Sequence, residues 1–131
     1  MIIGVQLYGG TRAAVLGLGL DLTGTRLALL TGDYVFDSAH SQWADVATAE
    51  ISGGAYPAGG KPLGGAIADG AYHAAGGKTV FDGLEHTFSY GVLVSGDTLL
   101  GCLTFNEGNP IHVSGYDFEV TWSELGVFRL E

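Results

Sequence analysis

The chain has 131 residues, and apolar side chains make up 47% of them, which is enough to build a hydrophobic core and excludes a wholly disordered protein. Glycine is unusually frequent, at 23 residues, whereas charged residues account for only 15%. Because glycine destabilises helix interiors and favours tight turns, this composition argues against a helical bundle. We expect short strands in a single domain over residues 1–131.

The charge balance is strongly acidic. Fourteen Asp and Glu residues against five Lys and Arg residues give a formal net charge of -9. Phosphate groups are bound by clustered basic residues, so we expect no nucleic acid and no anionic membrane as a partner. An acidic surface instead suits docking onto a basic protein. Apolar stretches are also broken well before the roughly 18 residues that a membrane-spanning helix needs.

The first predicted elements are two strands and a short helix. Leucine alternates with glycine and aspartate through residues 15–22, which predicts a strand with one buried face. Residues 26–31 form a nearly continuous apolar run, which is typical of a buried central strand. Asp37 can cap a short helix that places Trp43 and Val46 on one side.

The middle of the chain is rich in glycine. Between residues 51 and 77 glycines recur too often for long elements. We expect only short strands here, around residues 50–52, 63–68 and 71–73.

A hairpin is the clearest prediction in the second half. Residues 87–95 and 98–105 are rich in strand-forming residues, and the dipeptide Gly96-Asp97 between them is typical of a tight hairpin turn. Both faces of this hairpin are apolar, which indicates a two-layer structure or a subunit contact. The turn sets three opposite pairs: Val94 with Leu99, Leu93 with Leu100, and Gly91 with Cys102.

The chain ends in two further predicted strands. Tyr116, Phe118, Val120 and Trp122 alternate with polar residues, which predicts a half-buried strand, and a last strand starts at Gly126. The count is about eight strands with turn signals at regular intervals. This pattern predicts an all-β fold, an antiparallel β-sandwich of about eight strands with one short helix.

One glycine motif invites a nucleotide-binding interpretation. Gly76-Gly77-Lys78-Thr79 ends like a phosphate-binding loop, but the first glycine of that motif is replaced by Tyr72. We therefore interpret it as a plain turn carrying a surface lysine. The one cysteine, Cys102, lies in an apolar run, which favours a buried thiol over a nucleophile.

No constellation of catalytic or metal-binding residues is apparent. Asp82, Glu85 and His86 lie close together in sequence, but Asp82-Gly83 is itself a turn dipeptide, so we interpret them as a solvated turn. The histidines lack the close spacing of metal ligands, so a zinc site requires that the fold gather them: His40, His73, His86 and His112. We expect no catalytic, cofactor or metal site, and no enzyme.

A segment within the glycine-rich region carries a family resemblance. Residues 50–60, Glu-Ile-Ser-Gly-Gly-Ala-Tyr-Pro-Ala-Gly-Gly, resemble the segment Glu-Val-Ser-Gly-x-Gly-Tyr-x-Ala-Gly-Gly of a family of small virion structural proteins of tailed bacteriophages. Ala55 departs from that pattern, and the segment between Asp82 and Gly91 is shorter than in the family. Further segments resemble the family in the same order along the chain: residues 21–31, 81–82, 91–94, 99–105 and 120–122.

The resemblance implies a non-enzymatic structural protein, located in the virion and assembled in the host cytoplasm. We expect a capsid decoration or cement protein on the outside of the head, because a compact acidic subunit suits many copies that clamp neighbouring coat subunits. Its partners would be the major capsid protein or other virion proteins, and copies of itself. A tail or tail-fibre protein is the alternative within the virion. A carbohydrate-binding β-sandwich module is the alternative from another class, and an exposed Trp43 beside polar groups would favour it.

The twin apolar faces of the hairpin motivate an interface hypothesis. Assembly would use the hairpin or the glycine-rich residues 53–77. The candidate contact residues are Leu93, Val94, Leu99, Leu100, Trp43 and Tyr56.

Overall fold

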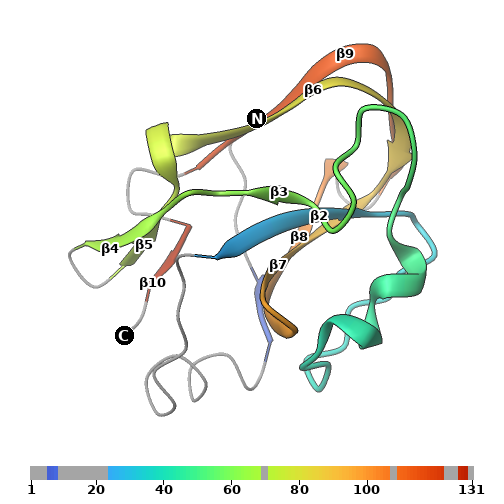
Figure 1. The fold of residues 1–131 in the computed structure, drawn as a ribbon. Helices are drawn as coiled ribbons and strands as arrows, with labels where there is room; N and C mark the ends of the chain where they lie inside the picture. The colour runs from blue at the N-terminus through green and yellow to red at the C-terminus, as the bar shows by residue number, and fades with distance from the viewer. Residues whose placement is uncertain (1–5, 9–23, 69–70, 107–108, 123–126, 130–131) are drawn as a thin grey trace.

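Three antiparallel sheets make up the described part of the chain (Figure 1). The computed structural model describes residues 6–8, 24–68, 71–106, 109–122 and 127–129, and the strand predicted at residues 15–22 lies outside them. The all-β, antiparallel fold predicted from the sequence is confirmed. The five-stranded sheet has the order β1 (Gln6–Leu7), β8 (Thr98–Thr104), β7 (Tyr90–Ser95), β2 (Thr25–Leu30) and β3 (Lys61–Pro62). The three-stranded sheet has the order β10 (Phe128–Arg129), β5 (Ala71–His73) and β4 (Ala66–Ala68), and β6 (Lys78–Phe88) pairs with β9 (Ile111–Thr121) as a two-stranded ribbon.

The five-stranded sheet is covered on both faces. On one face Leu27, Leu93 and Leu103 join a core that includes Phe81 and Phe118 of the arching β6–β9 ribbon (Figure 1). A second core lies on the other face, where residues 31–49, the segment after β2, pack over the sheet. Its buried members are Tyr8, Ala28, Leu30, Tyr34, Val46, Val92, Val94, Leu99 and Cys102. The two apolar faces of the predicted hairpin therefore both pack inside this chain.

The hairpin register differs from the predicted one by a single residue. Val94 lies opposite Leu99 as expected, but a bulge follows, so that Leu93 lies opposite Gly101 rather than Leu100. Gly91 then lies opposite Leu103 instead of Cys102. An extra residue in one strand of a pair shifts every later partner by one, and turn chemistry alone does not reveal it.

The strand expected over residues 87–95 is divided between two sheets. Thr87 and Phe88 end the long strand β6, and β7 begins only at Tyr90. The residue between them is Ser89. Its backbone N–H donates to the carbonyl of Leu30, and its carbonyl accepts the backbone N–H of Phe105. Ser89 thus marks the corner where the chain passes from the ribbon to the five-stranded sheet.

Two glycines bend the β6–β9 ribbon. Gly83 and Gly115 both have a positive φ, of 59° and 75°, and the strand register shifts beside them. Asp82-Gly83 is therefore a bulge within a strand, not the predicted turn, and the Gly83 N–H donates to the Asp117 carboxylate at 2.9 Å. The predicted alternation holds for Phe118, Val120 and Trp122, which are buried, and it fails only at the residue that follows Gly115. Tyr116, predicted to face the core, is 74% exposed, whereas Phe118 is buried.

The predicted short helix is present as two single 3-10 turns. These are η1 (Trp43–Asp45) and η2 (Ala47–Ala49), and a third, η3 (Ala75–Gly77), precedes β6. Asp37 does not cap them, because its carboxylate accepts the N–H of Ala39 in a local turn at 2.9 Å. Within the described residues, none of the helical turns has the length or apolar character needed to cross a bilayer.

The glycine-rich residues 50–60 form a loop whose two ends lie on strand β2. At one end Leu30 bridges Glu50, and at the other Leu27 pairs with Lys61 of β3. Gly60 closes the loop with a φ of 102°. A Cβ atom at this position would clash with the backbone carbonyl group of Leu27, so glycine lets the loop return to the strand.

We expect Gly60→Ala to lower the free energy of unfolding by about 2–4 kcal/mol, because it combines an unfavourable positive φ with a clash against backbone. Urea denaturation followed by circular dichroism measures the change. Gly24→Ala is the matched control, since a Cβ there meets no atom within 4 Å. Equal stabilities of the two variants would contradict this account of the loop.

Candidate functional site

The residues proposed for an interface are mostly buried within the chain. Leu93, Val94 and Leu100 are fully buried, and Leu99 is 1% exposed. These four side chains fill the two cores, so the apolar faces of the hairpin belong to a layered structure within the chain, the first of the two alternatives that their pattern indicated, and they are not exposed to a partner. The reason is that the β6–β9 ribbon covers one face and the segment after β2 covers the other.

Tyr56, another proposed contact residue, organises the glycine loop from inside. Its ring is 5% exposed and stacks on Phe81 with centroids 6.0 Å apart. Its hydroxyl accepts the Leu29 backbone N–H at 3.1 Å and donates to the Glu50 carboxylate at 2.6 Å. The same carboxylate oxygen accepts the Gly59 N–H at 3.0 Å. Burial raises the pKa of Tyr56, and the hydrogen bond to Glu50 adds to this effect.

Trp43 is half-buried, so its ring is not the exposed stacking surface that a carbohydrate-binding site would need. Its ring packs against the second core, and the Arg26 guanidinium lies over it, 5.4 Å from the ring centroid. Arg26 also donates to the carbonyl of Gly59 in the glycine loop at 2.6 Å and to that of Gly96 in the hairpin turn at 3.0 Å. One side chain therefore connects the loop, the turn and the first 3-10 turn.

Residues that were considered for phosphate or metal binding make hydrogen bonds within the chain. Thr79 continues from a glycine turn into strand β6, and its hydroxyl accepts the indole N–H of Trp122 at 3.0 Å. His86 contacts the carbonyl of Gly53 at 2.9 Å, and His112 contacts the hydroxyl of Thr87 at 2.7 Å. Over the part of the chain that the structure covers, no three His, Cys, Asp or Glu side chains gather in a way that could hold a metal ion.

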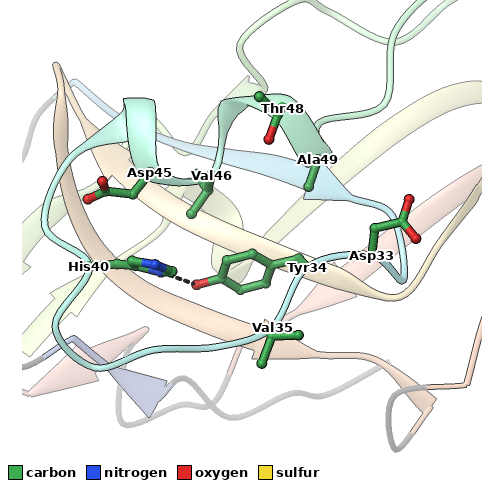
Figure 2. A pocket seen from close by; sticks show the side chains of 8 residues that line it. All are labelled: Asp33, Tyr34, Val35, His40, Asp45, Val46, Thr48 and Ala49. Atoms are coloured by element: carbon green, nitrogen blue, oxygen red, sulfur yellow. Dashed lines mark hydrogen bonds between the residues drawn. The ribbon is translucent and has the colours of Figure 1, made fainter.

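A cleft of about 420 Å³ opens within the segment after β2, between residues 33–40 and the 3-10 turns η1 and η2. Figure 2 shows the Tyr34 ring in the middle of this cleft, with His40 beside it and the carboxylates of Asp33 and Asp45 toward its two ends. Thr48 and three apolar residues complete the lining: Val35, Val46 and Ala49. Val35 is 77% exposed at the edge of the cleft.

A chain of hydroxyl groups leads from the cleft into the second core. The His40 Nδ1 atom lies 3.3 Å from the Tyr34 hydroxyl, and this hydroxyl shares a hydrogen bond of 2.5 Å with the hydroxyl of Tyr8. Burial raises the pKa of both tyrosines, and burial also raises the pKa of the neighbouring Cys102 thiol to about 12. These groups remain protonated at neutral pH, so Cys102 is not a nucleophilic thiolate.

Asp45 has a different environment at the outer end of the cleft. Its carboxylate accepts the backbone N–H groups of Ser41 and Gln42, each at 3.0 Å. These hydrogen bonds hold the pKa of Asp45 below its ordinary value. The carboxylate is therefore ionised at neutral pH.

Two of these arrangements were not predicted from the sequence. The Glu50–Tyr56 hydrogen bond had a signal, because an acid and a tyrosine six residues apart in a glycine-rich loop can meet only if the loop folds back. The Tyr8–Tyr34–His40 chain had none, since its members come from three separate segments. Comparison with known proteins identifies no relative: no protein-family model matches the chain, and no curated protein or solved structure matches it significantly.

We expect Tyr56→Phe to lower the free energy of unfolding by about 1–3 kcal/mol, because the buried Leu29 N–H and the Glu50 carboxylate lose a shared partner. Urea denaturation at neutral pH measures the difference. Tyr116→Phe removes a hydroxyl from an exposed ring and serves as the control, with little expected effect. A Tyr56→Phe variant as stable as the control would show that this hydroxyl does not hold the loop.

Stability should fall as the pH rises above about 9, the region where unfolded Cys and Tyr side chains ionise. The folded chain raises the pKa of Tyr8, Tyr34, Tyr56, Tyr72 and Cys102, so above this pH the unfolded state releases protons that the folded state retains. Thermal unfolding at pH 7 and pH 10.5 tests the effect. A melting temperature that is equal at the two values would contradict the burial of these groups.

Proposed function

We propose that this chain is a non-enzymatic structural protein of a tailed-bacteriophage virion, which binds the outside of the head as a decoration subunit. The observation that carries the proposal is the role of residues 50–60, which resemble a segment of that family and are followed and preceded by further similar segments in the same order. Within this loop Glu50 and Tyr56 bind each other, and the loop closes on Gly60. Residues that match the family's segment thus hold this loop onto strand β2, which supports a structural role for the resemblance.

The exterior of the chain is consistent with docking by charge. Asp82, Glu85, Asp117 and Glu119 are exposed along the β6–β9 ribbon, and the whole chain carries a net charge of -9. Complementary charge across an interface speeds association and selects the partner. A basic region of a coat protein is therefore the kind of surface that this chain would contact. Repetition over a closed shell lets each contact remain modest.

The sugar-binding alternative has less support. A stacking platform needs an aromatic face open to the sugar ring. At Trp43 the Arg26 guanidinium already lies over the ring, which also packs against the second core. A tail protein would need the same stable fold as a head protein. The two locations are therefore distinguished by the number of copies in each virion.

We expect this chain and the major capsid protein to be present in comparable copy numbers in purified virions. Quantitative mass spectrometry with isotope-labelled peptides from both proteins measures the ratio, and a known tail protein provides a low-copy reference. A handful of copies per particle would place the protein in the tail instead. Absence from the virion would overturn the proposal and return attention to the ligand-binding alternative.

A further inference from the structure

Strand β9 has an unpaired edge in the part of the chain that the structure describes. It pairs with β6 alone, and no main-chain hydrogen bond to a described residue outside the ribbon involves residues 111–121. At the crest of the arch in Figure 1, β9 is the outer strand of the ribbon. An edge of this kind carries main-chain N–H and C=O groups with which a further strand can pair.

The core that contains Phe81 is least covered beside this edge. Val113 and Phe118, both on β9, are 9% and 8% exposed, whereas every other buried member of that core is 6% exposed or less. A strand added next to β9 would extend the ribbon over these two side chains. Burial in the first core is therefore incomplete at the same place where main-chain pairing is incomplete.

The burial pattern of β9 shifts by one residue at its bend. Val113 is buried before the bend, and Phe118 and Val120 are buried after it, so the inward positions change from odd to even numbers. Regular strands alternate without such a shift, and Gly115, with its positive φ, lies where it occurs. Two antiparallel copies of β9 therefore keep all their inward residues on one face only in the register where the two bends meet, with Gly115 of one copy opposite Tyr116 of the other.

The exposed side chains are complementary in this same register. His112 lies opposite Glu119 of the second copy, and Ser114 lies opposite Asp117, and each pair occurs twice. The Nδ1 atom of His112 is 2.7 Å from the Thr87 hydroxyl, so Nε2 is the ring nitrogen left to donate to the facing carboxylate. Carboxylates on an exposed edge usually discourage strand pairing, but here each one faces a hydrogen-bond donor.

We propose that two copies of this chain associate edge to edge through β9, about a two-fold axis that passes between Gly115 and Tyr116. The two ribbons then form one four-stranded antiparallel sheet, and Val113 of each copy contacts Phe118 of the other. Because the same surface of both copies is used, the assembly closes at two. This inference does not rest on the virion role, since self-association is a property of the isolated chain.

Sedimentation velocity of the full chain over a range of concentrations tests the association. It is measured at physiological salt, which screens the general repulsion between two chains that each carry a net charge of -9. We expect a reversible monomer–dimer equilibrium. A chain that stays monomeric throughout would overturn the proposal.

A matched pair of charge variants tests whether β9 forms the contact. Glu119→Lys should raise the dissociation constant of the dimer about tenfold, because the dimer contains this position twice and each lysine removes the acceptor that faces His112. Asp97→Lys makes the same change of charge at an exposed position of the hairpin turn and should leave the dimer intact. Equal effects of the two variants would contradict the assignment. Circular dichroism spectra that match the natural chain show that both variants are folded.

A cysteine pair tests the register. Positions 112 and 119 of one copy lie roughly 23 Å apart along the strand, too far for a disulfide, but in the dimer they face each other. The double variant His112→Cys/Glu119→Cys should therefore form disulfide-linked dimers under mild oxidation, whereas His112→Cys alone should not. The natural Cys102 is buried and does not compete. Equal yields of linked dimer from the two variants, or none from the double variant, would contradict this register.

Discussion

The glycine loop, residues 50–60, depends on the hydrogen bonds that the Glu50 carboxylate accepts. This carboxylate accepts the Tyr56 hydroxyl and the Gly59 N–H, and the same hydroxyl accepts the N–H of Leu29. Strand β2 therefore supplies a fixed point for a loop whose glycines make no side-chain contacts and in which Ile51 and Tyr56 are the residues packed into the core. Glycine has a high conformational entropy in the unfolded chain, so such a loop stays ordered only where specific hydrogen bonds compensate for that loss.

Arg26 extends this constraint to the other face of the sheet. Its guanidinium binds the loop at Gly59 and the hairpin turn at Gly96, and it also covers the Trp43 ring. These contacts help to place the segment after β2 over the second core. The segment covers apolar residues that would otherwise expose one face of the hairpin. The same segment also lines the cleft around Tyr34, so its placement fixes the position of the cleft.

The sequence predicted the strands better than it predicted their register. Apolar runs and turn dipeptides located β2, β7, β8 and β9, because burial of one or both faces imposes a pattern on consecutive residues. The bulges beside Leu93 and Gly83 were missed, since each depends on an extra residue in one strand relative to its partner. Tyr116 shows the consequence, because a bend at Gly115 places a residue with core-like spacing on the surface.

The site residues were harder to predict for a related reason. Leu93, Val94, Leu99 and Leu100 were chosen as contacts because they are apolar, but apolar residues on a hairpin are as readily covered by the chain's own elements. Which segment covers them is a property of the whole fold, not of the hairpin. With both faces filled, a partner would contact the exterior, where carboxylates outnumber basic groups and where, among the residues that the structure describes, the exposed large apolar side chains are Val35 and Tyr116. If the chain docks onto a coat protein as proposed, complementary charge would select the partner, and apolar contact would add affinity only at isolated points.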